Sequence, residues 1–235
     1  MVEFKNCVNI IKEEVKLAFS NNKGLLFFSI LVFIIPLVIG YIYADQISTY
    51  IQPVVENFEK QVENGTVTLT THSLFLNNFK VSLILYALSA LGGVLGLFVL
   101  FNNGLFIGFY GNGYDLLTYI ILTLPHGIFE LPAIIISTTG GLVLLSFILH
   151  FIYNLFYPDY SYVDIFDPYF SDVKISAKQR ISAAFNKNKN KIKESFVLLC
   201  VSVVLLLIAA TIEANLTIPF AYWISSIFGN AMAFI

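Results

Sequence analysis

Residues 24–44 read GLLFFSILVFIIPLVIGYIYA, and they contain no Asp, Glu, Lys, Arg or His. At about 1.5 Å per residue, a helix of this length crosses the roughly 30 Å of hydrocarbon in a bilayer. Pro36 is expected to bend this helix, and Tyr41 and Tyr43 are placed to anchor its far end at the membrane interface. The stretch therefore predicts the first transmembrane helix of an integral membrane protein.

The composition of the whole chain agrees with this prediction. Of the 235 residues, 57% are hydrophobic and only 12% are charged, whereas about a quarter of the residues in soluble domains are charged. A soluble protein of this size could not bury so much apolar surface. The net charge of −2 says little about partners, because in a membrane protein the positions of Lys and Arg matter more. Nucleic acid is not an expected partner. The predicted partner is the lipid bilayer.

The fold class predicted for the rest of the chain is all-α, a polytopic integral membrane helical bundle with about five transmembrane helices. In residues 2–19 apolar side chains recur at helical spacing, which fits a helix in the membrane interface or one packed on the protein's own loops. The predicted divisions are an amphipathic interfacial helix at 1–23, a first part of the membrane core at 24–156 with an outer loop at 45–72, a basic loop at 157–195, and a second part of the core at 196–235.

The middle of the chain predicts an irregular membrane segment. Residues 74–101 are expected to form one long helix that Asn102 and Asn103 end. In residues 104–124, two apolar runs then flank the polar sequence GNGYD, which predicts an interrupted third segment sheltered by protein or water. The following PHGIFELP sequence begins at Pro125 and could form a half-helix or re-entrant turn. Residues 216–235 could form a sixth span, but their proline and small residues favour a helix that leans back into the membrane.

The distribution of basic residues predicts the orientation. Seven of the thirteen Lys and Arg residues fall within 157–195, and four more precede the first span. Basic loops stay on the cytoplasmic side of a membrane. We therefore expect a multi-pass protein of the cell membrane whose N-terminus and 157–195 loop are both cytoplasmic.

Four ionisable residues within or beside the apolar runs are the candidate functional residues: Asp115, His126, Glu130 and Glu213. No Lys or Arg falls within residues 81–173 to neutralise them. A charge at the bilayer centre costs about 3 kcal/mol on insertion scales, so such groups need a polar cavity or must stay neutral. Asp115 and Glu213 have an alternative interpretation as cap or terminal residues at the interface.

His126 and Glu130 are spaced i and i+4, so on a helix they face the same way. They could form a hydrogen-bonded pair that holds the Pro-bounded turn, or bind a proton or polar substrate during transport. A metal site needs a third ligand, for which only His72 and His150 are candidates. Cys7 and Cys200 have no metal-ligand spacing, and no hydrolase, metalloprotease or phosphate-loop motif occurs. The sequence therefore predicts no catalytic residue, no metal, no cofactor and no enzymatic activity.

Small residues at helical spacing are expected to let helix backbones approach closely in the membrane. The glycines assigned to helix packing are Gly92, Gly96, Gly104, Gly108, Gly140 and Gly141.

The chain also resembles a known family. Asn103 to Gly108, the segment from Pro125 to Ala133 with the sequence PHGIFELPA, Gly140 with Gly141, and the sequence IEA at residues 212–214 are similar to the stage II sporulation protein M family of multi-pass membrane proteins. The resemblance spans most of the chain from about residue 80. Its most specific element is P-H-G-x-x-E-L, and it marks His126, Glu130 and Glu213 as the polar membrane residues of the family.

The resemblance implies a non-enzymatic membrane scaffold, or a component of envelope remodelling. We expect a homodimer formed through small-residue faces, with envelope proteins as possible partners. The alternative is a transporter or lipid-handling protein with a polar intramembrane cavity around His126 and Glu130.

Overall fold

The computed structural model describes residues 2–65, 68–157 and 176–228, and within these ranges it contains helices and no strand. Five helices are long and apolar enough to cross a membrane, in agreement with the predicted fold class. They are α2 (Lys23–Ile42), α4 (Thr71–Gly92), α5 (Val94–Asn112), α6 (Leu116–Phe156) and the continuous segment Ala177–Ile224. The last segment comprises α7 (Ala177–Ile212), a π-helix (Glu213–Thr217) and most of α8 (Ile218–Phe228).

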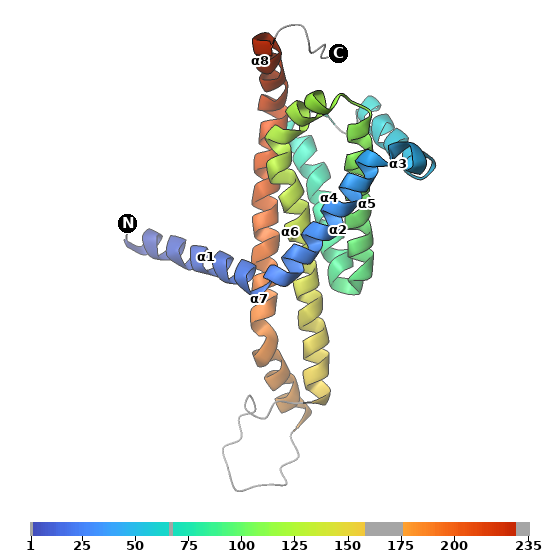
Figure 1. Ribbon diagram of the computed structural model, residues 1–235. Coiled ribbons are helices and arrows are strands. Elements are labelled where there is room, and N and C mark those ends of the chain that lie inside the picture. Colours follow the sequence, from blue (N-terminus) through green and yellow to red (C-terminus); the bar gives the residue numbers. More distant parts are fainter. Residues whose placement is uncertain (1, 66–67, 158–175, 229–235) are drawn as a thin grey trace.

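The spans form an antiparallel bundle around α6 and α7 (Figure 1). The two remaining helices lie outside this bundle. The helix α1 (Val2–Asn21) runs across the bundle axis near the start of α2, and α3 (Ala44–Glu63) lies at the opposite end. The helix α6 has 41 residues, or about 60 Å, which is twice the thickness of the bilayer core. Together with the first part of α7 it therefore projects beyond the other spans.

The predicted second helix at 74–101 is wrong, because the chain turns back in the middle of that stretch. Gly93 separates α4 from α5 and has a φ of +47°, a left-handed conformation that glycine adopts without steric cost. Asn102 and Asn103 do not end a helix either. Their side chains donate hydrogen bonds to the carbonyl oxygens one turn earlier, at 2.8 and 2.9 Å, and so remain inside α5.

The predicted interruption of the third segment is also wrong. The GNGYD sequence joins two spans, because α5 ends at Asn112 and α6 begins at Leu116. Pro125 and Pro132 both lie within α6, so no re-entrant turn forms there. The helix is bent near its beginning (Figure 1), in the part that contains Pro125, as expected where a proline removes a backbone hydrogen bond.

The C-terminal segment does not lean back into the membrane. The helix α8 follows the π-helix and extends in the direction of α7 (Figure 1). Its apolar residues therefore prolong the fifth span. Residues 229–235, the end of the segment considered in the sequence, lie outside the described residues.

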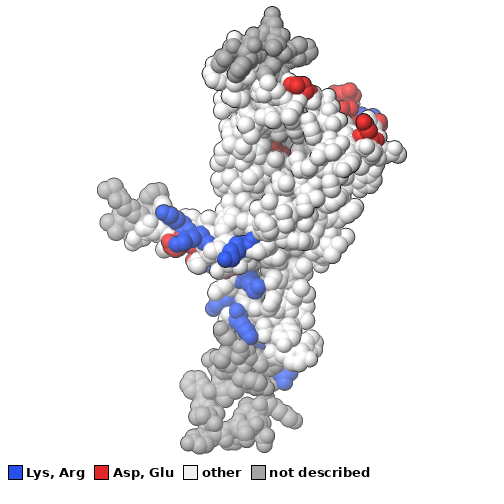
Figure 2. Space-filling view, in the orientation of Figure 1, with Lys and Arg blue, Asp and Glu red and all other residues white. Residues whose placement is uncertain are grey.

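Much of the predicted basic loop is helical. Residues 158–175 lie outside the described residues, but residues 177–195 form the first turns of α7. Ser176 caps this helix by accepting a hydrogen bond from the backbone N–H of Gln179, while Gln179 bonds the backbone of Ser176 in return. Figure 2 shows most of the basic side chains gathered around α1 and the projecting part of the bundle, and a group of acidic side chains at the opposite end.

Candidate functional site

His126, Glu130 and Glu213 come together in the structure. One ligand-type atom from each of the three side chains lies within 4.8 Å of the other two. His126 and Glu130 come from α6, and Glu213 comes from the π-helix that follows α7. We call these three residues the His-Glu-Glu cluster. They lie within two of the candidate membrane spans.

Local helix geometry explains how the cluster forms. His126 and Glu130 are one turn apart on the same helix, so their side chains share a face. Glu213 opens the π-helix Glu213–Thr217, in which one extra residue is accommodated in the turn. Such local expansions of an α-helix are frequent at functional sites, because they change the direction of the side chains that follow. Here the expanded turn brings Glu213 and Thr217 to α6.

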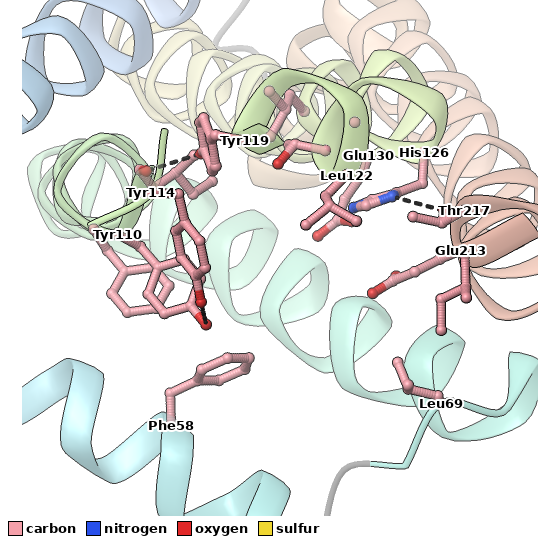
Figure 3. A pocket seen from close by; sticks show the side chains of 16 residues that line it. Phe58, Leu69, Tyr110, Tyr114, Tyr119, Leu122, His126, Glu130, Glu213 and Thr217 are labelled. Atoms are coloured by element: carbon pink, nitrogen blue, oxygen red, sulfur yellow. Dashed lines mark hydrogen bonds between the residues drawn. The ribbon is translucent and has the colours of Figure 1, made fainter. Parts of the chain in front are cut away.

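Thr217 orients the imidazole of His126. Its Oγ1 lies 3.3 Å from Nδ1 of His126 and 3.5 Å from the carbonyl oxygen of Ile212. Both hydrogen bonds form together when the Thr217 hydroxyl donates to Ile212 and the His126 Nδ1–H donates to Thr217. A neutral histidine then has an unprotonated Nε2. Figure 3 shows this other ring nitrogen directed toward Glu130, with Glu213 pointing into the same space.

Two cavities reach the cluster, with volumes of about 430 and 530 Å³. All three cluster residues line both of them. The first cavity has an aromatic wall made by Phe58, Phe106, Tyr110, Tyr114 and Tyr119. The second has an amide wall made by Asn57, Gln61, Asn77, Asn78, Asn102 and Asn103. The cluster therefore faces polar groups and open volume, not a closed helix interface.

The described residues around the two cavities include no positive side chain that balances the acids of the cluster. Among the described residues that line the two cavities, none is Lys or Arg. Neither Glu130 nor Glu213 accepts a hydrogen bond from any residue in the described part of the chain. In Figure 2, a recessed acidic patch is visible within the uncharged surface of the bundle. Carboxylates in such surroundings need a proton, a cation or water to stabilise them.

Asp115 lies away from the cluster and lines neither cavity. It is the exposed N-cap of α6, where its carboxylate accepts hydrogen bonds from the backbone N–H and the hydroxyl of Thr118 at 3.0 and 3.1 Å. The backbone hydrogen bond, and then the hydroxyl, lower the pKa of Asp115 below its usual value. The structure therefore gives Asp115 the position of a cap residue.

The glycines singled out in the sequence have different surroundings. A Cβ added at Gly104 or Gly108 would overlap a backbone carbonyl of α2, and one at Gly141 would overlap the carbonyl of Tyr86 in α4. At Gly140, a Cβ would lie 3.2 Å from the carbonyl oxygen of Ser195, and at Gly96 it would overlap Ser89 across the α4–α5 turn. Gly92 is different, because a Cβ there would meet only the flexible side chain of Leu95, within its own turn.

Sequence reasoning missed Thr217 and the two cavity walls. No periodicity signals a π-helix, so nothing singled out Thr217 as a partner of His126. The asparagine pairs in α4 and α5 were a usable signal, because two such pairs in apolar helices need polar surroundings. His72 and His150, the third ligands considered for a metal, line neither cavity, and His150 instead lies 2.7 Å from the carbonyl oxygen of Ser146.

Comparisons with known proteins agree with the resemblance seen in the sequence. The model of the family described as stage II sporulation protein M matches residues 29–218, a range that includes the whole cluster. An uncharacterized protein of Methanocaldococcus jannaschii is 30% identical over 220 residues, which cover 90% of this chain and 89% of that protein. No solved structure matches the chain. The chain belongs to the stage II sporulation protein M family.

Proposed function

We propose that this protein is a transporter that admits a polar or cationic solute to the cavities beside the His-Glu-Glu cluster. The observation that carries the proposal is that both cavities reach Glu130. A scaffold does not require an unneutralised acid beside a cavity within the membrane. Intramembrane ionisable residues, in contrast, commonly line substrate and ion pathways. In this proposal the protein binds and releases its solute without covalent chemistry.

The depth of the cluster supports this proposal. Ile134 lies one turn after Glu130 and belongs to the same buried apolar cluster as Phe33, which lies near the middle of α2. One helical turn rises about 5.4 Å, so Glu130 lies within the span and not at its end. A solute that reaches Glu130 has therefore entered the membrane region.

The amide wall provides a polar route to that depth. Its residues come from α3, α4 and α5, and α3 lies at the end of the bundle opposite the basic residues (Figures 1 and 2). Side-chain amides both donate and accept hydrogen bonds, so they can replace the hydration of a polar solute. The positive-inside rule makes the basic end cytoplasmic, so we infer that this route opens toward the outer side.

Thiol accessibility in liposomes tests the route. In a background with Cys7→Ser and Cys200→Ser, Asn77→Cys on the amide wall is expected to react with a membrane-impermeant maleimide. Val38→Cys is the matched control, because Val38 is exposed in the second half of α2 and lines neither cavity. Equal protection of both cysteines would contradict a water-accessible cavity.

Flux measurements test transport itself. Proteoliposomes loaded with pH-sensitive or cation-sensitive dyes are expected to take up protons or a cation, and Glu130→Gln is expected to abolish that uptake. The Asp115→Asn variant is the control, because Asp115 lies outside the cavities. A Glu130→Gln variant with unchanged flux would overturn the proposal, and a folded wild-type protein that moves no proton or cation would rule out a cationic solute.

A homodimeric scaffold is the second candidate, and a separate observation favours it. In the projecting part of α6, Leu149, Ile152, Tyr153 and Phe156 form an apolar stripe with side chains that are 46–73% exposed. Their spacing is that of a helix–helix seam. Nearby, Lys191 of α7 donates a hydrogen bond to Ser146, so the stripe lies at or beyond the membrane surface.

The double variant Leu149→Glu, Tyr153→Glu tests this second candidate. It is expected to convert a dimer in nanodiscs to a monomer, and an unchanged particle mass would remove the candidate.

A further inference from the structure

We propose that His126, Glu130 and Glu213 are the protein ligands of a divalent transition-metal ion, with Zn²⁺ as the preferred ion. This inference rests on the proposed function only in that both use the same cavities. Imidazole together with carboxylates is a donor set suited to zinc and to neighbouring first-row metals. The sequence predicted no metal because His72 and His150 were the only third ligands considered, whereas the structure places Glu213 in that position.

The spacing of the three side chains fits one ion. Their ligand-type atoms lie within 4.8 Å of one another, so a point exists within about 2.8 Å of all three, the centre of an equilateral triangle of that side. Zinc binds imidazole nitrogen and carboxylate oxygen at about 2.0–2.2 Å. Each side chain therefore needs to move by less than about 1 Å, which small rotations of the two glutamates provide.

The hydrogen bond that His126 donates to Thr217 prepares the imidazole for this role. Metal-binding histidines usually donate their second ring N–H to a fixed acceptor, which sets the tautomer and the ring orientation. Here Nδ1 lies 3.3 Å from Thr217 Oγ1, and the other ring nitrogen is directed toward Glu130 (Figure 3). The unprotonated Nε2 and the two carboxylates can then each offer a lone pair to one cation.

The charge of the two carboxylates and the open volume beside them also favour a bound metal ion. The two carboxylates have no hydrogen-bond donor in the described part of the chain, and the cavity lining supplies no Lys or Arg. A divalent ion would neutralise both carboxylates at once. Three protein ligands leave a coordination position for water or a substrate, and the cavities of about 430 and 530 Å³ give that position room.

Metal binding can be measured on the detergent-solubilised, tag-free full-length chain after treatment with a chelator. Competition against a chromogenic chelator is expected to give one Zn²⁺ per chain. Glu130→Gln, Glu213→Gln and His126→Gln are each expected to weaken binding at least tenfold. Asp115→Asn and His150→Gln are the matched controls, because they remove an acid and a histidine outside the cluster, and they are expected to leave the affinity unchanged.

X-ray absorption of the zinc-loaded wild type keeps the test independent of whether the variants fold. The expected zinc environment has nitrogen and oxygen ligands at about 2.0–2.2 Å with outer-shell scattering from a single imidazole. Sulfur ligands, two or more imidazoles, or no stoichiometric zinc in the folded wild type would overturn the proposal. Zinc binding that is unchanged in each of the three single variants of the cluster would also overturn the proposal.

The failure of this inference is distinguishable from that of the proposed function, because no flux is measured in detergent. Stoichiometric zinc with no uptake in liposomes supports the metal site and removes transport. Uptake of protons by a protein that binds no zinc supports transport, and it assigns the two carboxylates to a shared proton in place of a metal.

Discussion

Oγ1 of Thr217 lies 3.3 Å from Nδ1 of His126, although 91 residues separate the two positions. The contact joins the π-helix after α7 to the bent first part of α6. It depends on the expanded turn, because Thr217 is the last residue of that π-helix and its side chain is buried there. The relationship makes the geometry of the cluster depend on the hydroxyl group of Thr217.

Removing that hydroxyl is expected to weaken zinc binding. Thr217→Val keeps the shape of the side chain but leaves Nδ1 of His126 without its partner, so the ring loses its fixed tautomer. Mutation of the residue that hydrogen-bonds a metal-binding histidine typically lowers the metal affinity about 10–100-fold. Chelator competition measures the change. The control is Thr211→Val, because the hydroxyl of Thr211 donates to the carbonyl oxygen of Leu207 within its own helix and Thr211 lines neither cavity. Equal affinities in both variants would contradict the role given to Thr217.

Asp115 gives a prediction about pH. Hydrogen bonds from the backbone N–H and hydroxyl of Thr118 lower its pKa in the folded protein, so the charged cap stabilises the fold above the ordinary pKa of about 3.9. That contribution is lost as the pH falls through the lowered folded pKa. The difference in unfolding temperature between the wild type and Asp115→Asn, measured in detergent, is therefore expected to be largest near neutral pH and to vanish in strong acid.

The control for this prediction is Asp45→Asn, which removes another exposed acid from the first turn of a helix. Its unfolding temperature is expected to follow that of the wild type more closely. A constant difference between the wild type and Asp115→Asn at every pH would mean that the charge of Asp115 contributes nothing to the stability of α6.

The sequence was sufficient to predict the part of the site that depends on one helix. His126 and Glu130 needed only the i, i+4 rule, and their setting in an apolar chain without nearby Lys or Arg identified them as unusual. The class of the fold was equally accessible, since runs such as residues 24–44 have no other stable environment than a membrane. These inferences use only local spacing and composition.

The predictions that the structure contradicts concern positions where two periodic segments of the sequence meet. Gly93 turns the chain between α4 and α5, but it stands within one continuous apolar run, so hydropathy could not locate the turn. The GNGYD sequence is a stronger turn signal than Gly93. The sequence alone, however, does not show whether such a turn connects two spans or interrupts a single span. The position of Glu213 beside Glu130 depends on the packing of α7 against α6 and on a π-helix, and neither has a local sequence pattern.

Close packing of α2 against α5 gives a prediction about stability. A Cβ at Gly108 would overlap the carbonyl oxygen of Leu37, so Gly108→Ala is expected to separate the helices and to destabilise the fold by about 1–3 kcal/mol, the usual cost of overpacking. Gly24→Ala is the matched control. No atom lies within 4 Å of a Cβ added there, and alanine favours a helix more than glycine does. Thermal unfolding in detergent compares the two, and similar losses of stability in both would contradict the packing role.

Glu194 holds α1 against the bundle, and this gives the last prediction. Its two carboxylate oxygens accept hydrogen bonds from Asn21 and Asn22 at 2.7 and 2.8 Å, at the junction of α1 and α2. An ion pair between Glu14 and Lys193 also joins α1 to α7, but the side chain of Lys193 is 58% exposed, and exposed pairs typically contribute less than about 1 kcal/mol. We therefore expect Glu194→Ala to release α1 from α7 even though the ion pair is intact.

The two native cysteines allow this release to be measured directly. Cys7 lies on α1 and Cys200 on α7, and both are free and exposed, so spin labels attached to them report the distance between the helices. In nanodiscs, Glu194→Ala is expected to broaden that distance distribution. Glu13→Ala, which removes an exposed acid from α1, is expected to leave it unchanged. If Glu194→Ala retains a narrow distribution, the hydrogen bonds of Glu194 are not needed to hold α1. The ion pair between Glu14 and Lys193 and the buried apolar cluster that includes Ala18 and Leu198 are then sufficient.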